Sequence, residues 1–467
     1  MSENLLLGTL LPHPPLVIPE VGGEELKQVL QTQAAMRRIG AEVVDLQPDV
    51  VVVISPHGPM FEDAVSVMGG AVLQGDLEEF GADVTFAFDN DEELAQLIVQ
   101  FGRQQNVPLY VVDEGIKAEF DLEKELDYGA TVPLYYVREA GYRGPVVLLS
   151  PGFVNVETLY RAGMCVQYAL RQLNRRAVLI ASGDNSHALL ADAPAGYREE
   201  GPKYDALLQR AIGEGDWLTL MTLEEGFLEV AAEDTVRSLA VLLGAHDLAA
   251  VSGEVLSYEG PFGVGYTVAR FAGGGETESL LHKIVAAEFK QMLRVREQES
   301  FFVRLAREAL ETYVREERVI EPPAPLPPEL QERAGCYVSL KMRGRLRGCI
   351  GTVEPGTGSL AEEIIRNAIA SGVEDDRFFP VEEDELEGIV YTVDVLEPEE
   401  PVHDRSGLDP QQYGLIVIKD DRSALLLPNL QGVNTVEEQI QFTKEKAGIQ
   451  PDEEDVEYFR FRVTRYR

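Results

Sequence analysis

The chain contains very little cysteine. Three cysteines occur among 467 residues, Cys165, Cys336 and Cys349, and no two of them form a CxxC pair. A disulfide framework or a zinc site built on cysteine would have too few ligands, and sparse cysteine suits a reducing compartment. Any bound metal ion must therefore be held by histidine and carboxylate side chains.

Long hydrophobic runs and an N-terminal targeting pattern are also missing. No apolar stretch reaches the roughly 18 to 20 residues needed to cross a bilayer, and the first four residues lack the basic segment of a signal peptide. We therefore expect a cytoplasmic protein without a membrane partner.

Basic residues are scarce relative to acidic ones. The sequence has 41 lysines and arginines against 80 aspartates and glutamates, which gives a formal net charge of −39. Such a surface repels anions and disfavours general binding to nucleic-acid backbones. Hydrophobic residues make up 45% of the chain, enough to bury the two or three cores expected for its length.

Strand-like and helix-like segments alternate through the first half of the sequence. Stretches of helical periodicity separate runs of branched apolar residues at 5–11, 50–54, 107–112, 146–150 and 178–181. This alternation predicts an α/β domain whose mainly parallel sheet is covered by helices. A run of glycines that begins after Ala272 indicates a domain boundary at this point. The predicted parts are a first domain over 1–271, a linker with a connecting helix over 272–299, and a smaller domain over 300–467.

Three of the six histidines follow the ends of predicted buried strands. His13 follows the run 5–11, His57 follows 50–54, and His187 follows 178–181. The carboxyl ends of parallel strands share one edge of a sheet, where α/β proteins bind ligands. A single histidine after a strand is more often a structural residue than a ligand. Three histidines at the same edge together predict one crevice lined by three imidazoles.

Glu259 is the predicted carboxylate partner of these histidines. It lies between a strand-like segment and a turn rich in glycine and proline, so its side chain can reach the same edge of the sheet. Two imidazoles and one carboxylate leave open positions on iron(II), and a further histidine can transfer protons near neutral pH. The predicted metal ligands are His13, His57 and Glu259, and His187 is the predicted acid or base. Asp184, three residues before His187, remains a competing ligand.

Four short segments around these residues resemble one enzyme family. Pro12-His13-Pro14-Pro15, Ser55-Pro56-His57, Gly183-Asp184-Asn185-Ser186-His187 and Glu259-Gly260 look like the metal and catalytic segments of class III extradiol ring-cleavage dioxygenases, a LigB-like superfamily that includes the Memo proteins. The resemblance covers residues 1 to about 271. It implies iron(II) at His13, His57 and Glu259, and His187 as acid or base. Zinc is the alternative metal, at a three-histidine site in which His187 replaces Glu259 as a ligand. The resemblance further implies an aromatic or related vicinal diol and O2 as substrates.

One segment departs from the family pattern. Many catechol-cleaving relatives read Asp-His-Gly before Val-Pro-Leu, where this chain has Asp127-Tyr128-Gly129. A phenol can donate a hydrogen bond but is a poor proton shuttle at neutral pH. Tyr128 is therefore the second predicted catalytic residue, as a hydrogen-bond donor.

The second half resembles a different family. Leu346-Arg347-Gly348-Cys349-Ile350-Gly351 and Asp375-Asp376-Arg377-Phe378-Phe379-Pro380 are similar to motifs of the AMMECR family, the AmmeMemoRadiSam system protein A, from about residue 300 to the C-terminus. The resemblance implies an α+β fold with Cys349 on or beside a strand, and the group's name implies a radical-SAM protein as partner. Two interpretations of Cys349 remain, a small buried residue and a reactive thiol.

Four basic residues alternate just before Cys349. On a single extended strand, Lys341, Arg343, Arg345 and Arg347 would all point to one face. The row is interpreted either as an anion site or as an edge strand protected from pairing by its charges.

Two functions follow from these patterns. The first is an iron(II)-dependent extradiol-type dioxygenase of aromatic compound metabolism, fused to an accessory domain and acting on a small-molecule diol with O2. The second is a non-catalytic metal-binding or recognition protein that works with a radical-SAM partner. Metal content and oxygen consumption separate the two, and the sequence leaves room for a homo-oligomer.

Overall fold

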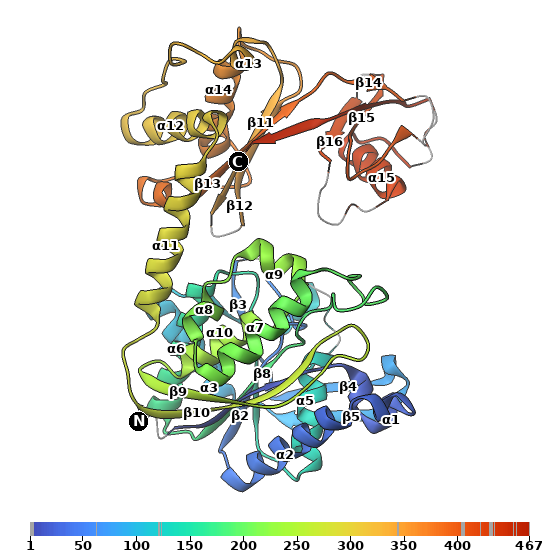
Figure 1. Ribbon diagram of the computed structural model, residues 1–467, viewed down its shortest axis with the longest axis vertical. Helices are drawn as coiled ribbons and strands as arrows, with labels where there is room; N and C mark the ends of the chain where they lie inside the picture. Colours follow the sequence, from blue (N-terminus) through green and yellow to red (C-terminus); the bar gives the residue numbers. More distant parts are fainter. Residues whose placement is uncertain are drawn as a thin grey trace. The chain divides into compact units, whose positions relative to one another are not determined.

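The computed structural model describes residues 4–61, 63–119, 122, 124–342, 345–402, 407–420, 422–428, 433, 435–451, 453 and 455–466. The chain forms two compact units, Met1–Lys290 and Gln291–Arg467 (Figure 1). Strand β10 (Tyr266–Glu276) continues through the predicted glycine linker. Helix α11 (Leu281–Gln298) carries the chain from one unit into the next.

An eight-stranded sheet forms the centre of unit 1. Its other strands are β1 (Leu5–Leu11), β2 (Val50–Ile54), β3 (Val65–Met68), β6 (Leu109–Val112), β7 (Val146–Ser150), β8 (Ala177–Ser182) and β9 (Ala249–Glu259). The strand order is β6-β3-β7-β2-β8-β1-β10-β9. Strands β7, β2, β8 and β1 run parallel, whereas β10 and β9 add an antiparallel edge. The predicted mainly parallel sheet is confirmed.

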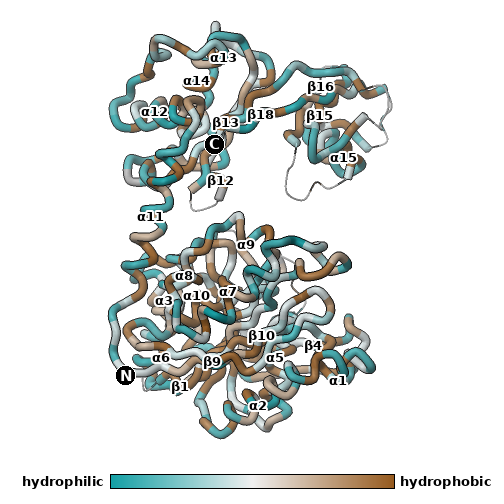
Figure 2. Tube along the Cα trace, viewed as in Figure 1, coloured by the Kyte–Doolittle hydropathy of each residue, from teal (hydrophilic) through white to brown (hydrophobic). Residues whose placement is uncertain are grey.

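Helices cover both faces of this sheet. One face packs on α3 (Glu92–Gln105), α6 (Val156–Leu173), α7 (Glu200–Glu214) and α10 (Thr235–Ala245). The other packs on α2 (Leu30–Leu46), α5 (Tyr128–Glu139) and the hairpin of β4 (Val72–Leu77) and β5 (Ala82–Asp89). Every residue of β2, β7 and β8 is buried, as expected for strands covered on both sides. Figure 2 shows apolar segments along the interior strands of unit 1.

Shorter helices complete unit 1. They are α1 (Pro19–Gly22), α4 (Glu114–Glu119), α8 (Trp217–Met221) and α9 (Glu225–Ala231). Helices α3 and α6 begin at the capping residues Asp91 and Asn155, whose side chains accept hydrogen bonds from the backbone of the first turn. Within the described parts of the chain, no helix is long and apolar enough to span a membrane.

Unit 2 is the smaller α+β domain that the sequence predicted. Helices α12 (Phe301–Glu316) and α14 (Leu360–Val373) pack on an antiparallel sheet of β12 (Arg345–Thr352), β11 (Cys336–Met342), β13 (Ile389–Leu396) and β18 (Val463–Tyr466). A second antiparallel sheet contains β14 (Glu400–Pro401), β17 (Glu457–Phe461), β15 (Gly414–Lys419) and β16 (Arg422–Leu426). Helix α15 (Val436–Lys446) packs on this second sheet, and α13 (Pro328–Gln331) lies near the first.

Candidate metal centre

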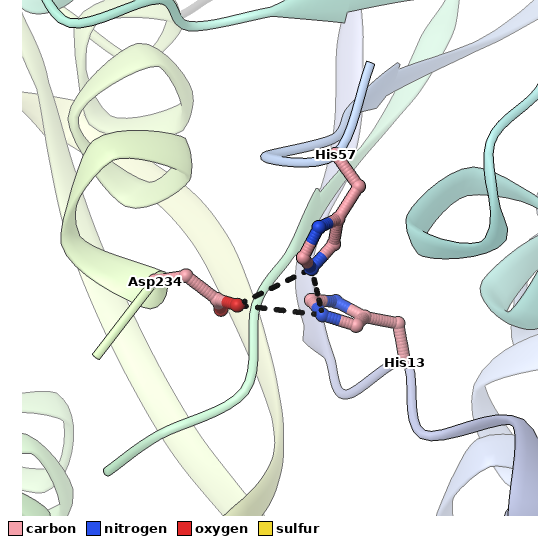
Figure 3. Close-up of side chains that lie close together, drawn as sticks. All are labelled: His13, His57 and Asp234. Atoms are coloured by element: carbon pink, nitrogen blue, oxygen red, sulfur yellow. Dashed lines mark hydrogen bonds and ion pairs between the residues drawn. The ribbon is translucent and has the colours of Figure 1, made fainter. Parts of the chain in front are cut away.

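Two parallel strands of the sheet bring His13 and His57 to the same edge. His13 follows β1 and His57 follows β2, and β8 lies between these two strands. The third member of the cluster is Asp234, the residue that precedes α10 (Figure 3). All three side chains therefore come from the carboxyl-end edge of the sheet or from the helix that begins beside it.

The three side chains have the spacing of metal ligands. His13 Nε2 lies 2.9 Å from His57 Nε2, and each of these nitrogens lies 3.5 Å from Asp234 Oδ2. Ligands bound at about 2.1 Å are separated by about 3.0 Å at neighbouring corners of an octahedron and by about 3.4 Å in a tetrahedron. One ion could therefore bind all three atoms without rearrangement of the backbone.

A hydrogen-bond chain sets the tautomer of His13. Ser182 Oγ donates to the Gly129 carbonyl at 2.5 Å, so it accepts from His13 Nδ1–H, which lies 3.0 Å away. The proton on Nδ1 leaves a lone pair on Nε2, the nitrogen that faces His57 and Asp234. Metal-binding histidines commonly have their second nitrogen engaged in this way.

The cluster favours positive charge. Burial alone would lower the pKa of His13, but the carboxylates of Asp184 and Asp234 raise it to about 9. Burial opposes ionisation of Asp234, yet His13 and His57 hold its pKa below the usual range. The half-buried carboxylate of Asp234 therefore favours a positive charge on the neighbouring imidazoles.

Asp184 holds two members of the cluster in place. Its Oδ1 accepts from the backbone N–H of His13 at 2.9 Å, and its own N–H donates to Asp234 Oδ1 at 2.6 Å. Thr235 Oγ1 donates to the Asp184 carbonyl at 2.7 Å. A Cβ at Gly183 would lie 2.7 Å from Thr235 Cα, so glycine permits this close approach.

Glu259 lies outside the cluster. Its Oε2 accepts hydrogen bonds from the backbone N–H and the hydroxyl of Thr32, at 2.8 and 2.7 Å. Glu259 ends β9, which is separated from β1 by β10, so its carboxylate caps the start of α2 instead. Asp234 is the carboxylate that the sequence analysis missed. Its signal in the sequence was an aspartate directly before the apolar helix α10, a position where aspartate usually caps the helix, although the Asp234 side chain makes no capping hydrogen bond here.

His187 lies near the cluster without belonging to it. Its Nδ1 donates to the Ala232 carbonyl at 2.8 Å, which leaves Nε2 as the nitrogen able to accept a proton. Ala232 is two residues before Asp234, and a charge on His187 contributes to the lowered pKa of Asp234. His187 is half-buried.

Tyr128 packs directly on the candidate metal ligands. Its ring stacks on the His57 ring with centroids 4.2 Å apart, and its hydroxyl lies 2.9 Å from His57 Nε2. Burial, together with the carboxylates of Asp234 and Asp184, raises the pKa of Tyr128 above its ordinary value. The phenol therefore stays protonated and is a hydrogen-bond donor at neutral pH.

The predicted basic row does not form on a single strand. Lys341 lies on β11 and Arg347 on β12, two strands that pair antiparallel. Arg347 forms an ion pair with Glu385 at 2.8 Å. Arg343 and the side chain of Arg345 lie outside the described residues.

Cys349 lies on β12, as the resemblance implied. Its thiol accepts a hydrogen bond from Ser339 Oγ at 3.2 Å, and burial raises its pKa. The thiol is therefore mainly protonated at neutral pH.

Two protein families match the chain. Residues 7–269 match the family described as catalytic LigB subunit of aromatic ring-opening dioxygenase, and residues 303–466 match AMMECR1. Protein CA_C1420 of Clostridium acetobutylicum is 38% identical over 462 residues, which is 98% of either chain. A protein of Thermotoga maritima is 52% identical over 168 residues, or 36% of this chain and 97% of that protein.

A solved structure also resembles part of the chain. Uncharacterized protein PH0010 from Pyrococcus horikoshii is 38% identical, covers 36% of this chain and 90% of its own, and aligns with a TM-score of 0.34. Both resemblances that the sequence motifs predicted are confirmed by the family matches. The chain therefore belongs to the family of catalytic LigB subunits of aromatic ring-opening dioxygenases, and its second unit is an AMMECR1 domain.

Proposed function

We propose that unit 1 is an iron(II)-dependent extradiol-type dioxygenase that opens an aromatic or related vicinal diol, with His13, His57 and Asp234 as metal ligands. The observation that carries this proposal is the convergence of two imidazole nitrogens, 2.9 Å apart, on one carboxylate oxygen 3.5 Å from each. Two histidines and one carboxylate on one side of an ion are typical of non-haem iron(II) oxygenases, because the remaining positions stay open.

The donor set fits such an ion. Both facing nitrogens need a cation or a proton between them, since two lone pairs at 2.9 Å repel each other. Ser182 fixes the His13 tautomer, and Asp184 fixes the backbone of His13 and the carboxylate of Asp234. Zinc(II) accepts the same donors, and the match to a dioxygenase family favours iron.

The bound metal, Tyr128 and His187 would each have a separate role in the reaction. Bound iron(II) would supply open positions for the diol oxygens and O2. Tyr128 donates a hydrogen bond to a substrate oxygen from its place over His57. His187 accepts a hydroxyl proton at Nε2, because its Nδ1–H is already donated to Ala232, and returns it as the ring opens.

Oxygen uptake tests the proposal. The full chain would be purified without oxygen, loaded with iron(II), and mixed with a panel of catechols in an oxygen electrode. We expect uptake that requires both iron and diol, with one O2 consumed per diol opened. A protein holding one iron per chain that consumes no oxygen with any diol would contradict the proposal.

A pair of histidine variants controls this assay. We expect His57→Ala to lose iron and oxygen uptake together, since His57 lies in the cluster. His282 is an exposed histidine on α11, so His282→Ala should retain both. Equal behaviour of the two variants would contradict the assignment of the site.

A further inference from the structure

A small hollow in unit 2 is lined by charges of both signs. Its charged lining residues are Glu397, Glu400, Arg460 and Arg462, and Tyr413 lines it as well. The hollow has a volume of about 230 Å³. Sites for drug-sized ligands usually measure about 300 to 1,000 Å³, so this hollow suits a smaller molecule.

The two arginines reach the hollow because they alternate with a buried residue. Arg460 and Arg462 flank Phe461 at the end of β17, and Phe461 is buried in a hydrophobic cluster of unit 2. Successive residues of an extended chain point to opposite sides, so the arginines point away from that cluster. Their guanidinium carbons lie 4.3 and 5.2 Å from the centre of the Tyr413 ring. Two cations are therefore gathered beside one aromatic ring.

The charge of Arg460 is balanced by Glu400. Glu400 on β14 is the cross-strand partner of Arg460, whose Nε and Nη2 both donate to Glu400 Oε2, at 3.0 and 2.9 Å. Arg460 Nη1 donates to the Gly407 carbonyl at 2.7 Å. These contacts hold the guanidinium in place, and they leave Glu400 Oε1 as an acceptor.

Arg462 has no such partner. Its Nη2 donates to the Tyr413 hydroxyl at 2.9 Å, and in the described part of the chain no carboxylate forms an ion pair with it. The hydrogen bond with Tyr413, and then the carboxylates of Glu397 and Glu400, raise the pKa of Arg462. Because the Tyr413 hydroxyl accepts from Arg462, its own proton can be donated elsewhere. Arg462 and Tyr413 together offer N–H and O–H donors to one incoming carboxylate.

Glu397 is the second charge of the hollow without an ion pair. It follows β13, and its backbone N–H donates to the Arg462 carbonyl at 2.9 Å, so the two residues are neighbours. Its Oε1 accepts only a long hydrogen bond, from Thr464 Oγ1 at 3.5 Å, and no cation among the described residues forms an ion pair with it. Glu397 and Glu400 Oε1 therefore offer acceptors on the acidic side of the hollow.

The balance of these charges selects the kind of ligand. Two arginines and two glutamates give the hollow no net charge. A simple anion drawn to Arg462 would be repelled by Glu397, and a simple cation would meet the reverse. A small molecule that carries both charges gains both attractions, because Arg462 and Glu397 line the same hollow without pairing with each other.

We propose that this hollow binds a free α-amino acid. The carboxylate of the ligand contacts Arg462 and the Tyr413 hydroxyl. Its ammonium group contacts Glu397 and Glu400 Oε1. These contacts are open to solvent, so the expected dissociation constant is about 1 mM. The inference concerns unit 2 and is independent of the oxygenase activity proposed for unit 1.

Calorimetry on the full chain tests the inference. Metal-free protein would be titrated with each of the amino acids found in proteins, because a bound metal ion could itself chelate them. We expect at least one amino acid to bind, with one molecule per chain. The amine that lacks its carboxylate and the acid that lacks its amino group should each bind at least about tenfold more weakly. The inference is overturned if no amino acid binds, or if either half-molecule or inorganic phosphate binds as tightly.

Paired variants assign the binding to the hollow. Arg462→Met and Glu397→Gln each remove one exposed charge, and each should weaken binding by about fivefold to tenfold. Arg304→Met and Glu308→Gln remove the same charges from exposed positions on α12 and should leave the affinity unchanged. Wild-type affinity in both hollow variants, or equal losses in the α12 variants, would overturn the inference.

Discussion

Asp184 should control metal affinity although it is outside the ligand cluster. Its carboxylate accepts from the backbone N–H of His13, and its own N–H donates to Asp234. Replacement by alanine removes the first contact and keeps the second, because the backbone N–H remains. The expected effect is therefore a loosened His13 with an intact Asp234.

The size of the effect follows from the contact that is lost. A hydrogen bond to a charged group contributes about 1.5 to 3 kcal/mol, which corresponds to about tenfold to a hundredfold in an equilibrium constant. Loss of a residue that orients a metal ligand typically costs the same range in affinity. Asp184→Ala should weaken zinc(II) binding by this factor, and Asp184→Asn, which keeps an acceptor oxygen, by less than about tenfold.

Competition with a chelator of known affinity measures the effect on folded, metal-free protein. Asp89→Ala is the charge-matched control, because Asp89 is exposed on β5, which belongs to a separate two-stranded sheet. Wild-type affinity in Asp184→Ala, in an assay where His57→Ala loses the metal, would refute the reasoning. A loss in Asp184→Asn as large as that in Asp184→Ala would also refute it.

Two further predictions concern two other histidines of unit 1, His246 and His187. Burial lowers the pKa of His246 to about 4 from 6.5, and its Nε2 has no partner among the described residues. Between pH 6.5 and about 4 the unfolded chain binds a proton at His246 while the folded protein does not. The free energy of unfolding of wild type, measured with urea, should therefore fall by about 3 kcal/mol over this range, and that of His246→Leu should not show this loss. Equal losses in the two proteins would contradict the assignment. His187→Gln should keep its metal and lose turnover by about 10² to 10⁴, the scale of a general acid or base. Metal loss in that variant would instead make His187 a ligand.

The central strands could be predicted from sequence because burial on both faces leaves a simple signal. The runs 5–11, 50–54 and 146–150 coincide with β1, β2 and β7, since covered parallel strands are continuously apolar. The hairpin of β4 and β5 gave no such signal, because exposed and buried residues alternate in it. The placement of Lys341 and Arg347 on two antiparallel strands was missed, because the same alternation of charges occurs on one strand and on a pair of strands.

The histidines of the site were predictable and its carboxylate was not. His13 and His57 follow strands whose neighbours in the sheet are set by the parallel α/β pattern. Glu259 and Asp234 are both acidic residues at the end of an element, in a chain with 80 of them. Asp234 faces the histidines because α10 packs beside β8. Glu259 does not, because β9 lies at the far edge of the sheet.

Metal stoichiometry in two carboxamide variants tests the central claim most directly. Asp234→Asn and Glu259→Gln each remove one negative charge and keep the shape of the side chain. With Asp234 as the ligand, Asp234→Asn should lose bound iron(II) under conditions where wild type holds one ion per chain. Glu259→Gln should retain the full complement, because its carboxylate is bonded to Thr32. Loss of iron from Glu259→Gln with retention in Asp234→Asn would contradict the account.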